Sequence, residues 1–262
     1  MMSDQAPQRK VALVTGASRG IGAATAIEFA GRGYDLAITS NESSPLEAVA
    51  AQLKAAGARV FAIAGDLSEM SFVESIAGRV VESLGRIDVL VNNAAWRELV
   101  TMRQISLFSW EQTLRICLTA PAFLARSAAR DMEKRRTGVI INVSSMMSVH
   151  ASGIAPAYIA AKGGLDSLTY DLAALYGPAG IRVVAVNPGA VDTDLSKDYS
   201  AADQLEFQQR LREWSEQMIP VRRWASPKEV GRFIAMIASD DASYVSGTTL
   251  TVDGGWSDHF QP

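Results

Sequence analysis

Residues 11–22 read Val-Ala-Leu-Val-Thr-Gly-Ala-Ser-Arg-Gly-Ile-Gly, and residues 23–30 continue as Ala-Ala-Thr-Ala-Ile-Glu-Phe-Ala. The apolar run at 11–14 has the length of a strand, and residues 23–30 have the composition of a helix. Glycine lets the backbone approach a ligand where a Cβ would clash, and the free N–H groups at a helix start stabilise an anion. The segment therefore predicts a strand, a phosphate-binding turn and a helix, with Gly16, Gly20 and Gly22 in the turn. An ordinary strand-to-helix turn with glycines kept for packing is the structural alternative.

A second motif combines Ser145 with Tyr158 and Lys162. Tyr158 and Lys162 are four residues apart in the Ala- and Leu-rich segment 155–175, so helix geometry places both side chains on one face. An ammonium held beside a tyrosine favours the phenolate, which makes this weak base usable at neutral pH. Ser145 comes shortly after the apolar run 139–143 and can donate to the same substrate oxygen from a strand end. Tyr–Lys pairs also occur on solvated helices. Together with the glycine turn, however, the three residues favour hydride transfer with a nicotinamide cofactor.

At these residues the chain resembles the short-chain dehydrogenase/reductase family, and the likeness extends from Lys10 to Trp256. The resemblance implies that Ser145 orients the substrate, Tyr158 exchanges the proton, and Lys162 binds ribose hydroxyls while acting on the tyrosine. It implies no metal site. The residues that it assigns to cofactor binding are Gly16, Ser18, Arg19, Gly20, Ile21, Gly22, Ser40, Asp66, Leu67, Asn93, Ala94, Tyr158, Lys162, Pro188, Gly189 and Thr193.

Two positions depart from the family pattern. Ala95 stands where Asn-Asn-Ala is usually followed by glycine, which narrows the space beside the cofactor. Cys117 opens the motif Cys-Leu-Thr-Ala-Pro, where the family usually has an asparagine. In the family the main-chain carbonyl of that asparagine helps to hold a water in the proton relay, and a cysteine still supplies a carbonyl. Cys117 is therefore expected to be a tolerated substitution.

The end of the second predicted strand bears on cofactor choice. An acidic residue there accepts hydrogen bonds from the ribose of NAD and repels the 2′-phosphate of NADP. This chain has Ser40 at that point, and Arg19 in the glycine turn is a cation that could meet the extra phosphate. Glu42, an acidic residue nearby, favours NAD(H) instead, and Arg19 can also be interpreted as a solvated surface charge. The sequence predicts NADP(H) in preference to NAD(H).

Strand and helix patterns alternate along the rest of the chain. Strands are expected at 59–64, 87–91 and 139–143, and helices at 70–84, 108–134 and 155–175. This alternation predicts right-handed βαβ crossovers and one α/β domain over residues 1–262, a doubly wound parallel sheet of Rossmann type with helices on both faces. Ligands then bind at the carboxyl ends of the strands.

The sequence distinguishes two further segments within this single domain. Residues 1–9 are expected to form a loose polar N-terminal tail. Residues 191–220 match the region that forms a flap over the substrate in the family. A surface helix packed by its aromatic residues is the alternative for the second segment.

Composition narrows the class of protein. The chain has 262 residues, 48% of them hydrophobic, which is enough for one substantial core. A net charge of −3 without a basic stripe argues against a nucleic-acid partner, and no apolar segment is long enough for a membrane span or a signal peptide. The single cysteine excludes an internal disulfide, so we expect a reducing, cytoplasmic location.

The substrate is the least determined part of the prediction. Candidates for the pocket wall are Trp96, Arg97, Met146, Met147 and His150, and an apolar, adaptable surface is expected. Among the family's branches, the chain looks most like 3-oxoacyl-acyl-carrier-protein reductases and glucose dehydrogenases. The basic cluster at 134–136 could dock an acidic carrier protein, although such a cluster also suits a helix end, and Ala179 replaces a basic residue that carrier reductases often have.

The predicted function is hydride transfer between NADP(H) and a carbonyl or secondary alcohol, with a 3-oxoacyl reductase as one candidate. A sugar or polyol dehydrogenase and a nucleotide-binding sensor without turnover are the alternatives. Because relatives pair the helices at 108–134 and 155–175 across a dyad and use the strand at 247–255 for a second interface, a homotetramer is expected.

Overall fold

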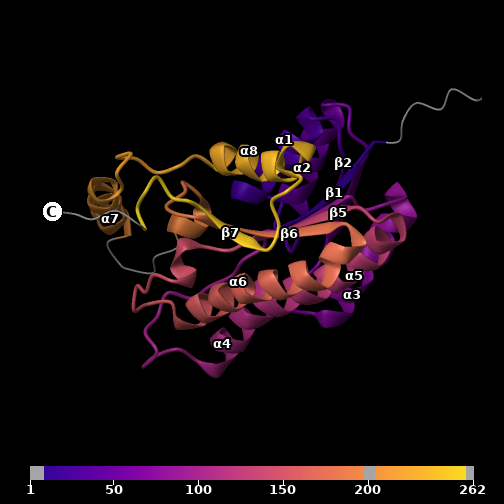
Figure 1. The fold of residues 1–262 in the computed structure, drawn as a ribbon. Helices are drawn as coiled ribbons and strands as arrows, with labels where there is room; N and C mark the ends of the chain where they lie inside the picture. Colours follow the sequence, from indigo (N-terminus) through magenta and orange to yellow (C-terminus); the bar gives the residue numbers. More distant parts are fainter. Residues whose placement is uncertain (1–8, 198–203, 258–262) are drawn as a thin grey trace, which may run out of the picture.

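Seven strands form one sheet in the order β3-β2-β1-β4-β5-β6-β7, and each neighbouring pair is parallel (Figure 1). The computed structural model describes residues 9–197 and 204–257. The strands are β1 Val11–Thr15, β2 Asp35–Ser40, β3 Val60–Ala64, β4 Val89–Asn92, β5 Gly138–Val143, β6 Ile181–Pro188 and β7 Thr248–Val252. This confirms the predicted doubly wound α/β fold. The predicted tail lies outside the described residues except for Arg9, as do residues 198–203 of the predicted flap.

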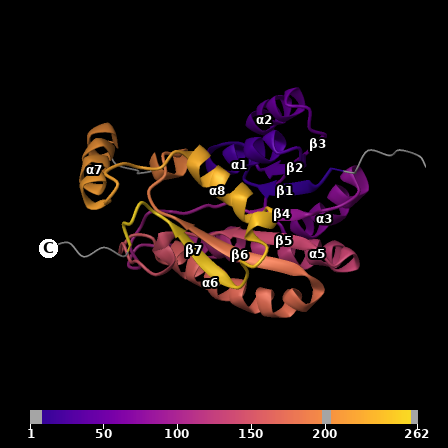
Figure 2. The same ribbon diagram turned by 45° about the horizontal axis from the view of Figure 1, so that its top comes forward.

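Helices cover both faces of the sheet. The helices are α1 Gly20–Gly31, α2 Ser43–Ala55, α3 Met70–Leu84, α4 Leu107–Leu114, α5 Ala120–Arg135, α6 Pro156–Tyr176, α7 Gln204–Met218 and α8 Pro227–Ile237. Side chains of α1, α2 and α8 share one core cluster with the sheet, and side chains of α3, α5 and α6 share another (Figures 1 and 2). In β1, Ala12 and Val14 enter the first cluster and Val11 and Leu13 the second, as the alternation of side chains along a strand requires.

The strand order reverses between β1 and β4. The chain builds β1, β2 and β3 outward, then returns to the other side of β1 for β4. The ends of β1 and β4 are tied together, because Thr15 Oγ1 accepts hydrogen bonds from the backbone N–H groups of Asn93 at 2.9 Å and Ala94 at 3.0 Å. Such a reversal leaves a crevice at the carboxyl ends of the strands, where ligands of this fold class bind.

The helix expected at 108–134 is divided into three parts. Between α4 and α5, residues Arg115–Thr119 form a π-helical turn, and the N–H of Ala120 donates to the carbonyl of Arg115. Pro121 has no N–H and cannot supply the donor that the carbonyl of Cys117 would receive in an α-helix. The wider turn therefore accommodates a proline that would otherwise interrupt the helix.

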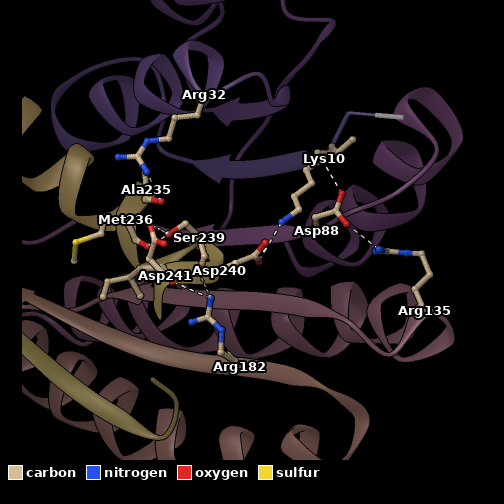
Figure 3. Close-up of polar contacts among 12 residues, drawn as sticks. Lys10, Arg32, Asp88, Arg135, Arg182, Ala235, Met236, Ser239, Asp240 and Asp241 are labelled. Atoms are coloured by element: carbon tan, nitrogen blue, oxygen red, sulfur yellow. Dashed lines mark hydrogen bonds and ion pairs between the residues drawn. The ribbon is translucent and has the colours of Figure 1, made fainter. Parts of the chain in front are cut away.

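Charged residues join the segments at the amino ends of the strands (Figure 3). Asp88 accepts from the backbone N–H of Val11 at 2.8 Å and forms an ion pair with Arg135 at 2.8 Å. Lys10 pairs with Asp240 at 3.4 Å. These contacts hold β1 against neighbouring segments at the end of the sheet opposite the crevice.

The basic cluster at 134–136 lies in this same region. Arg135 contacts Asp88 and Asp131, and Arg136 donates to the carbonyl of Pro178 at 2.8 Å. Two of its three cations are therefore bound within the fold.

Within the described part of the chain, no helix has the length and apolar character needed to cross a membrane.

Candidate active site

A cavity of about 860 Å³ opens at the carboxyl ends of the strands. It brings together residues that are far apart in the sequence, from the glycine turn, the ends of β2, β4, β5 and β6, and helix α6. Of the residues predicted for catalysis and cofactor binding, those that line it are Gly16, Ser18, Arg19, Gly20, Ile21, Ser40, Asp66, Leu67, Asn93, Ala94, Ser145, Tyr158, Lys162, Pro188, Gly189 and Thr193.

Among the residues predicted for catalysis and cofactor binding, only Gly22 does not line the cavity. It packs against the backbone of the turn instead. A Cβ at Gly22 would lie 2.2 Å from the carbonyl oxygen of Gly16, and a Cβ at Gly16 would lie 2.8 Å from Cα of Ala94. Gly16 also has a φ of +64°, which other residues rarely adopt. The turn is therefore packed too closely for side chains.

The residues around the turn fit a dinucleotide. The turn leads into the first residue of α1, Gly20, so the free N–H groups of the helix start face the crevice region where a pyrophosphate would bind. Asp66 and Leu67 line the cavity beyond β3, and Pro188, Gly189 and Thr193 line it beyond β6. One cavity thus connects the glycine turn with the residues that follow β3 and β6.

Tyr158 and Lys162 lie one helical turn apart on α6, and both side chains are buried. The Lys162 ammonium donates to the carbonyl of Val143 at 2.7 Å and lies 5.4 Å from the centre of the Tyr158 ring. Ser145 follows β5, and its hydroxyl oxygen accepts from the N–H of Met147 at 3.2 Å. The carbonyl of Val143 thus fixes the lysine at the end of the strand that leads to the serine.

A polar network next to these residues was not predicted from the sequence. The amide nitrogen of Asn187 donates to Asp166 at 2.9 Å and to the hydroxyl of Ser148 at 3.0 Å. Asp166 lies one turn beyond Lys162 on α6, and Asn187 precedes Pro188 at the end of β6. The network connects the helix that carries Tyr158 to the end of β6. In the sequence, the one signal for this network was an aspartate four residues after Lys162 on the predicted helix.

Cys117 lies in the π-helical turn and is fully buried beside Tyr158. Its thiol donates to the carbonyl of Trp96 at 3.4 Å, and the N–H of Trp96 donates to its sulfur at 3.5 Å. Burial raises the pKa of the Cys117 thiol, so the neutral form is favoured. These properties suit a structural thiol better than a nucleophile.

The variant Cys117→Asn is expected to keep the fold and to turn over at an unchanged or higher rate. An amide at this position can donate to and accept from the backbone of Trp96, as the thiol does now. Cys117→Ala removes both contacts and is expected to cost about 1–3 kcal/mol of stability. Steady-state kinetics and thermal unfolding of both variants test this. Loss of turnover in both would show that the thiol takes part in the chemistry.

Around Ser40 the hydroxyl groups and charges form a small polar surface. The Ser40 hydroxyl donates to the Ser18 hydroxyl at 2.9 Å, and the N–H of Glu42 donates to Ser40 at 3.3 Å. Arg19 pairs with Glu42 at 2.9 Å and with Asp194 at 3.7 Å. Glu42 therefore contacts Arg19, while the side chains that line the cavity here are those of Ser18, Arg19, Ser40 and Asn41.

The residues predicted for the substrate pocket line this cavity together with residues that were not predicted. Trp96, Arg97, Met146, Met147 and His150 line it as predicted. Three tryptophans from the C-terminal part of the chain, Trp214, Trp224 and Trp256, line it as well. Trp214 belongs to α7, which lies apart from the two helical layers (Figures 1 and 2). The centres of the Trp214 and Trp256 rings lie 6.5 Å apart in an edge-to-face arrangement.

No cluster of three or more metal-ligating side chains occurs among the described residues.

Comparisons with known proteins place this geometry in a family. A family model described as Enoyl-(Acyl carrier protein) reductase matches residues 16–257. The chain is 36% identical to cis-4-hydroxycyclohexanecarboxylate dehydrogenase of Sinomonas cyclohexanicum, over 95% of this chain and 96% of that protein. It is 33% identical to a 3-oxoacyl-[acyl-carrier-protein] reductase of Synechocystis sp., over 94% and 96%.

A solved structure agrees with these sequence matches. The L-sorbose reductase of Gluconobacter frateurii, solved with NADPH and L-sorbose, matches with a TM-score of 0.88 and 29% identity, over 97% of this chain and 98% of that one. The chain belongs to the short-chain dehydrogenase/reductase family of oxidoreductases, whose members act on alcohol and carbonyl groups.

Proposed function

We propose that the protein transfers a hydride between NADP(H) and a small compound with a ketone or secondary alcohol group. The observation that carries this proposal is that Ser145, Tyr158 and Lys162 line the same cavity as the glycine turn. The nicotinamide ring of the cofactor, when bound, supplies or accepts the hydride.

The three side chains divide the remaining chemistry. Tyr158 gives a proton to the carbonyl oxygen in reduction and takes it back in oxidation. Ser145 donates a hydrogen bond to the same oxygen and orients the substrate. Lys162, held by the carbonyl of Val143, places a positive charge where negative charge develops on the tyrosine. The hydrogen bond between Asn187 and Asp166 fixes the position of α6 relative to the end of β6.

Preference for NADP(H) rests on the groups near Ser40. An acidic side chain at this strand end would repel a 2′-phosphate, and the chain has a serine there. The hydroxyls of Ser18 and Ser40 and the guanidinium of Arg19 are donors that suit a phosphate. Glu42 competes for Arg19, so its substitution by glutamine is expected to tighten NADPH binding.

A free small substrate fits the site better than one carried by an acyl carrier protein. The basic cluster at 134–136 is largely bound within the fold, at the end of the sheet opposite the cavity. A sugar or polyol remains the alternative substrate class, since L-sorbose reductase shares the fold. The ordered Ser145, Tyr158 and Lys162 disfavour a sensor without turnover.

The test is turnover. Purified protein is mixed with NADPH and a panel of ketones, ketoesters, keto acids and sugar-derived carbonyls, and cofactor absorbance is followed. Oxidation of NADPH that depends on the carbonyl supports the proposal, and a protein that binds NADPH without turning over any substrate class contradicts it.

We propose the cytoplasm as the location of the protein, since the single cysteine suits a reducing compartment.

The protein is expected to be a homotetramer in solution. Large apolar side chains are exposed on α4, at Leu107 and Phe108, and on α6, at Tyr170 and Leu175. Exposed apolar patches of this kind mark surfaces that associate, and a symmetric interface places the same patch on both subunits. Light scattering should give four times the 28.1 kDa of one chain. A monomer at micromolar concentration would refute this expectation.

A further inference from the structure

Arg97 is a cation placed inside the substrate part of the cavity. It follows β4 in the chain, and its guanidinium carbon lies 5.5 Å from the centre of the Tyr158 ring. One terminal nitrogen donates to the carbonyl of Leu195 at 2.9 Å, and the other lies 4.0 Å from the sulfur of Met147. A substrate that reaches Tyr158 therefore passes close to this charge.

The charge of Arg97 has no counter-charge in the part of the chain that is described. No carboxylate there lies within 4.0 Å of its guanidinium, and its Nε is buried without a hydrogen-bond partner. Of the acidic residues that line the cavity, Asp194 pairs with Arg19, and Asp66 accepts from the N–H of Ser68 near the adenosine end.

Burial of the Arg97 guanidinium costs free energy unless a ligand supplies the missing hydrogen-bond acceptors and negative charge. The five N–H groups of the Arg97 guanidinium have two acceptors, one carbonyl oxygen and one thioether sulfur, and the sulfur is a weak acceptor. Arg135 is also partly buried and its Nε also lacks a partner, but two carboxylates, those of Asp88 and Asp131, balance its charge. Partial burial of an unpaired charge destabilises the fold. The exception at the substrate cavity therefore points to a ligand that brings the missing negative charge.

We propose that the protein selects substrates that carry a carboxylate, with Arg97 as the residue that binds it. The carboxylate fits because a guanidinium presents paired N–H groups that match its two oxygens. Apolar side chains that line the same cavity as Arg97, those of Trp96, Leu99 and Met147, suit a short hydrocarbon body between the carboxylate and the reacting carbon. This inference rests on the proposed function, since it names the substrate class of the same site.

Another role for Arg97 is structural. Its contacts with Leu195 and the Tyr158 ring would then orient the tyrosine and the segment after β6, with no part in recognition. The two roles differ in what a substitution does. Loss of a structural contact lowers turnover of every substrate equally, whereas loss of a carboxylate-binding residue affects only anionic substrates.

The kinetic test compares levulinate with methyl levulinate, which differ in the charge of the carboxyl group. With NADPH, Arg97→Met is expected to lower kcat/KM for levulinate by about 10- to 100-fold, the value of a charge-assisted hydrogen bond, and to leave the ester within about 3-fold. Arg97→Lys should restore part of the loss because it keeps the charge. Arg103→Met, an exposed arginine on the same segment, is the control. An equal effect on both substrates, or none on either, overturns the inference and leaves the proposed function standing.

A binding test does not need turnover. The tryptophans of the cavity report occupancy, so cyclohexanecarboxylate and cyclohexanecarboxamide are titrated against tryptophan fluorescence and by calorimetry. Tighter binding of the carboxylate, lost in Arg97→Met, supports the inference even if no tested carbonyl is reduced. Equal binding of the two compounds, or a carboxylate preference that survives in Arg97→Met, overturns it.

Discussion

Tyr158→Phe is expected to lower kcat by about 100- to 10,000-fold, the range for removal of a positioned acid–base group. The hydroxyl is the proposed proton carrier, and phenylalanine fills the same buried space beside Cys117 and Ala161. The variant should therefore fold normally. Dinucleotide affinity should change little, since the glycine turn, Ser40 and Asp66 are untouched.

Single-turnover rates with saturating NADPH, together with NADPH binding by fluorescence, measure this effect. Tyr170→Phe is the matched control: it removes a hydroxyl from the same helix, where Tyr170 is exposed and contacts Thr249. The control should retain activity. A Tyr158→Phe variant with a rate near that of the wild type would mean that another group moves the proton and that the proposed mechanism is wrong.

Local sequence patterns predicted the elements that form the site. The helix expected at 70–84 is α3, and the helix expected at 155–175 differs from α6 by one residue at each end. The strand, turn and helix around Gly16 occur in the expected order, but α1 begins at Gly20, so Gly20 and Gly22 lie in its first turn and not in the loop before it. These segments are predictable because their periodicity, glycine spacing and apolar runs are properties of neighbouring residues.

Features that depend on contacts between distant residues were not predictable in the same way. The π-helical turn at Cys117 interrupts a helical pattern that contains no glycine and only one proline near its middle. Trp224 and Trp256 reach the cavity from segments without a motif, and Asp166 meets Asn187 only because α6 packs beside β6. The basic cluster at 134–136 is a further example, since the ion pair of Arg135 with Asp88 cannot be read from either local sequence.

Ser40→Asp is expected to shift cofactor preference from NADPH toward NADH by on the order of 100-fold in the ratio of kcat/KM values. Two terms contribute. A carboxylate beside the Ser18 hydroxyl repels the 2′-phosphate, and it accepts hydrogen bonds from the ribose hydroxyls of NADH. Each charge-assisted hydrogen bond gained or lost is worth about 1.5–3 kcal/mol, and about 1.4 kcal/mol is a factor of ten.

The size of that shift depends on charge rather than on shape, and the controls separate the two. Ser40→Asn has nearly the same volume as the aspartate variant without its charge, so it should change the preference much less. Arg19→Gln should weaken NADPH alone, because Arg19 is the cation beside Ser18 and Ser40. Parallel titrations of the two cofactors measure all three variants. A wild-type protein that binds NADH more tightly than NADPH would remove the premise, and an equal shift in Ser40→Asn would show that space at the end of β2, not charge, sets the preference.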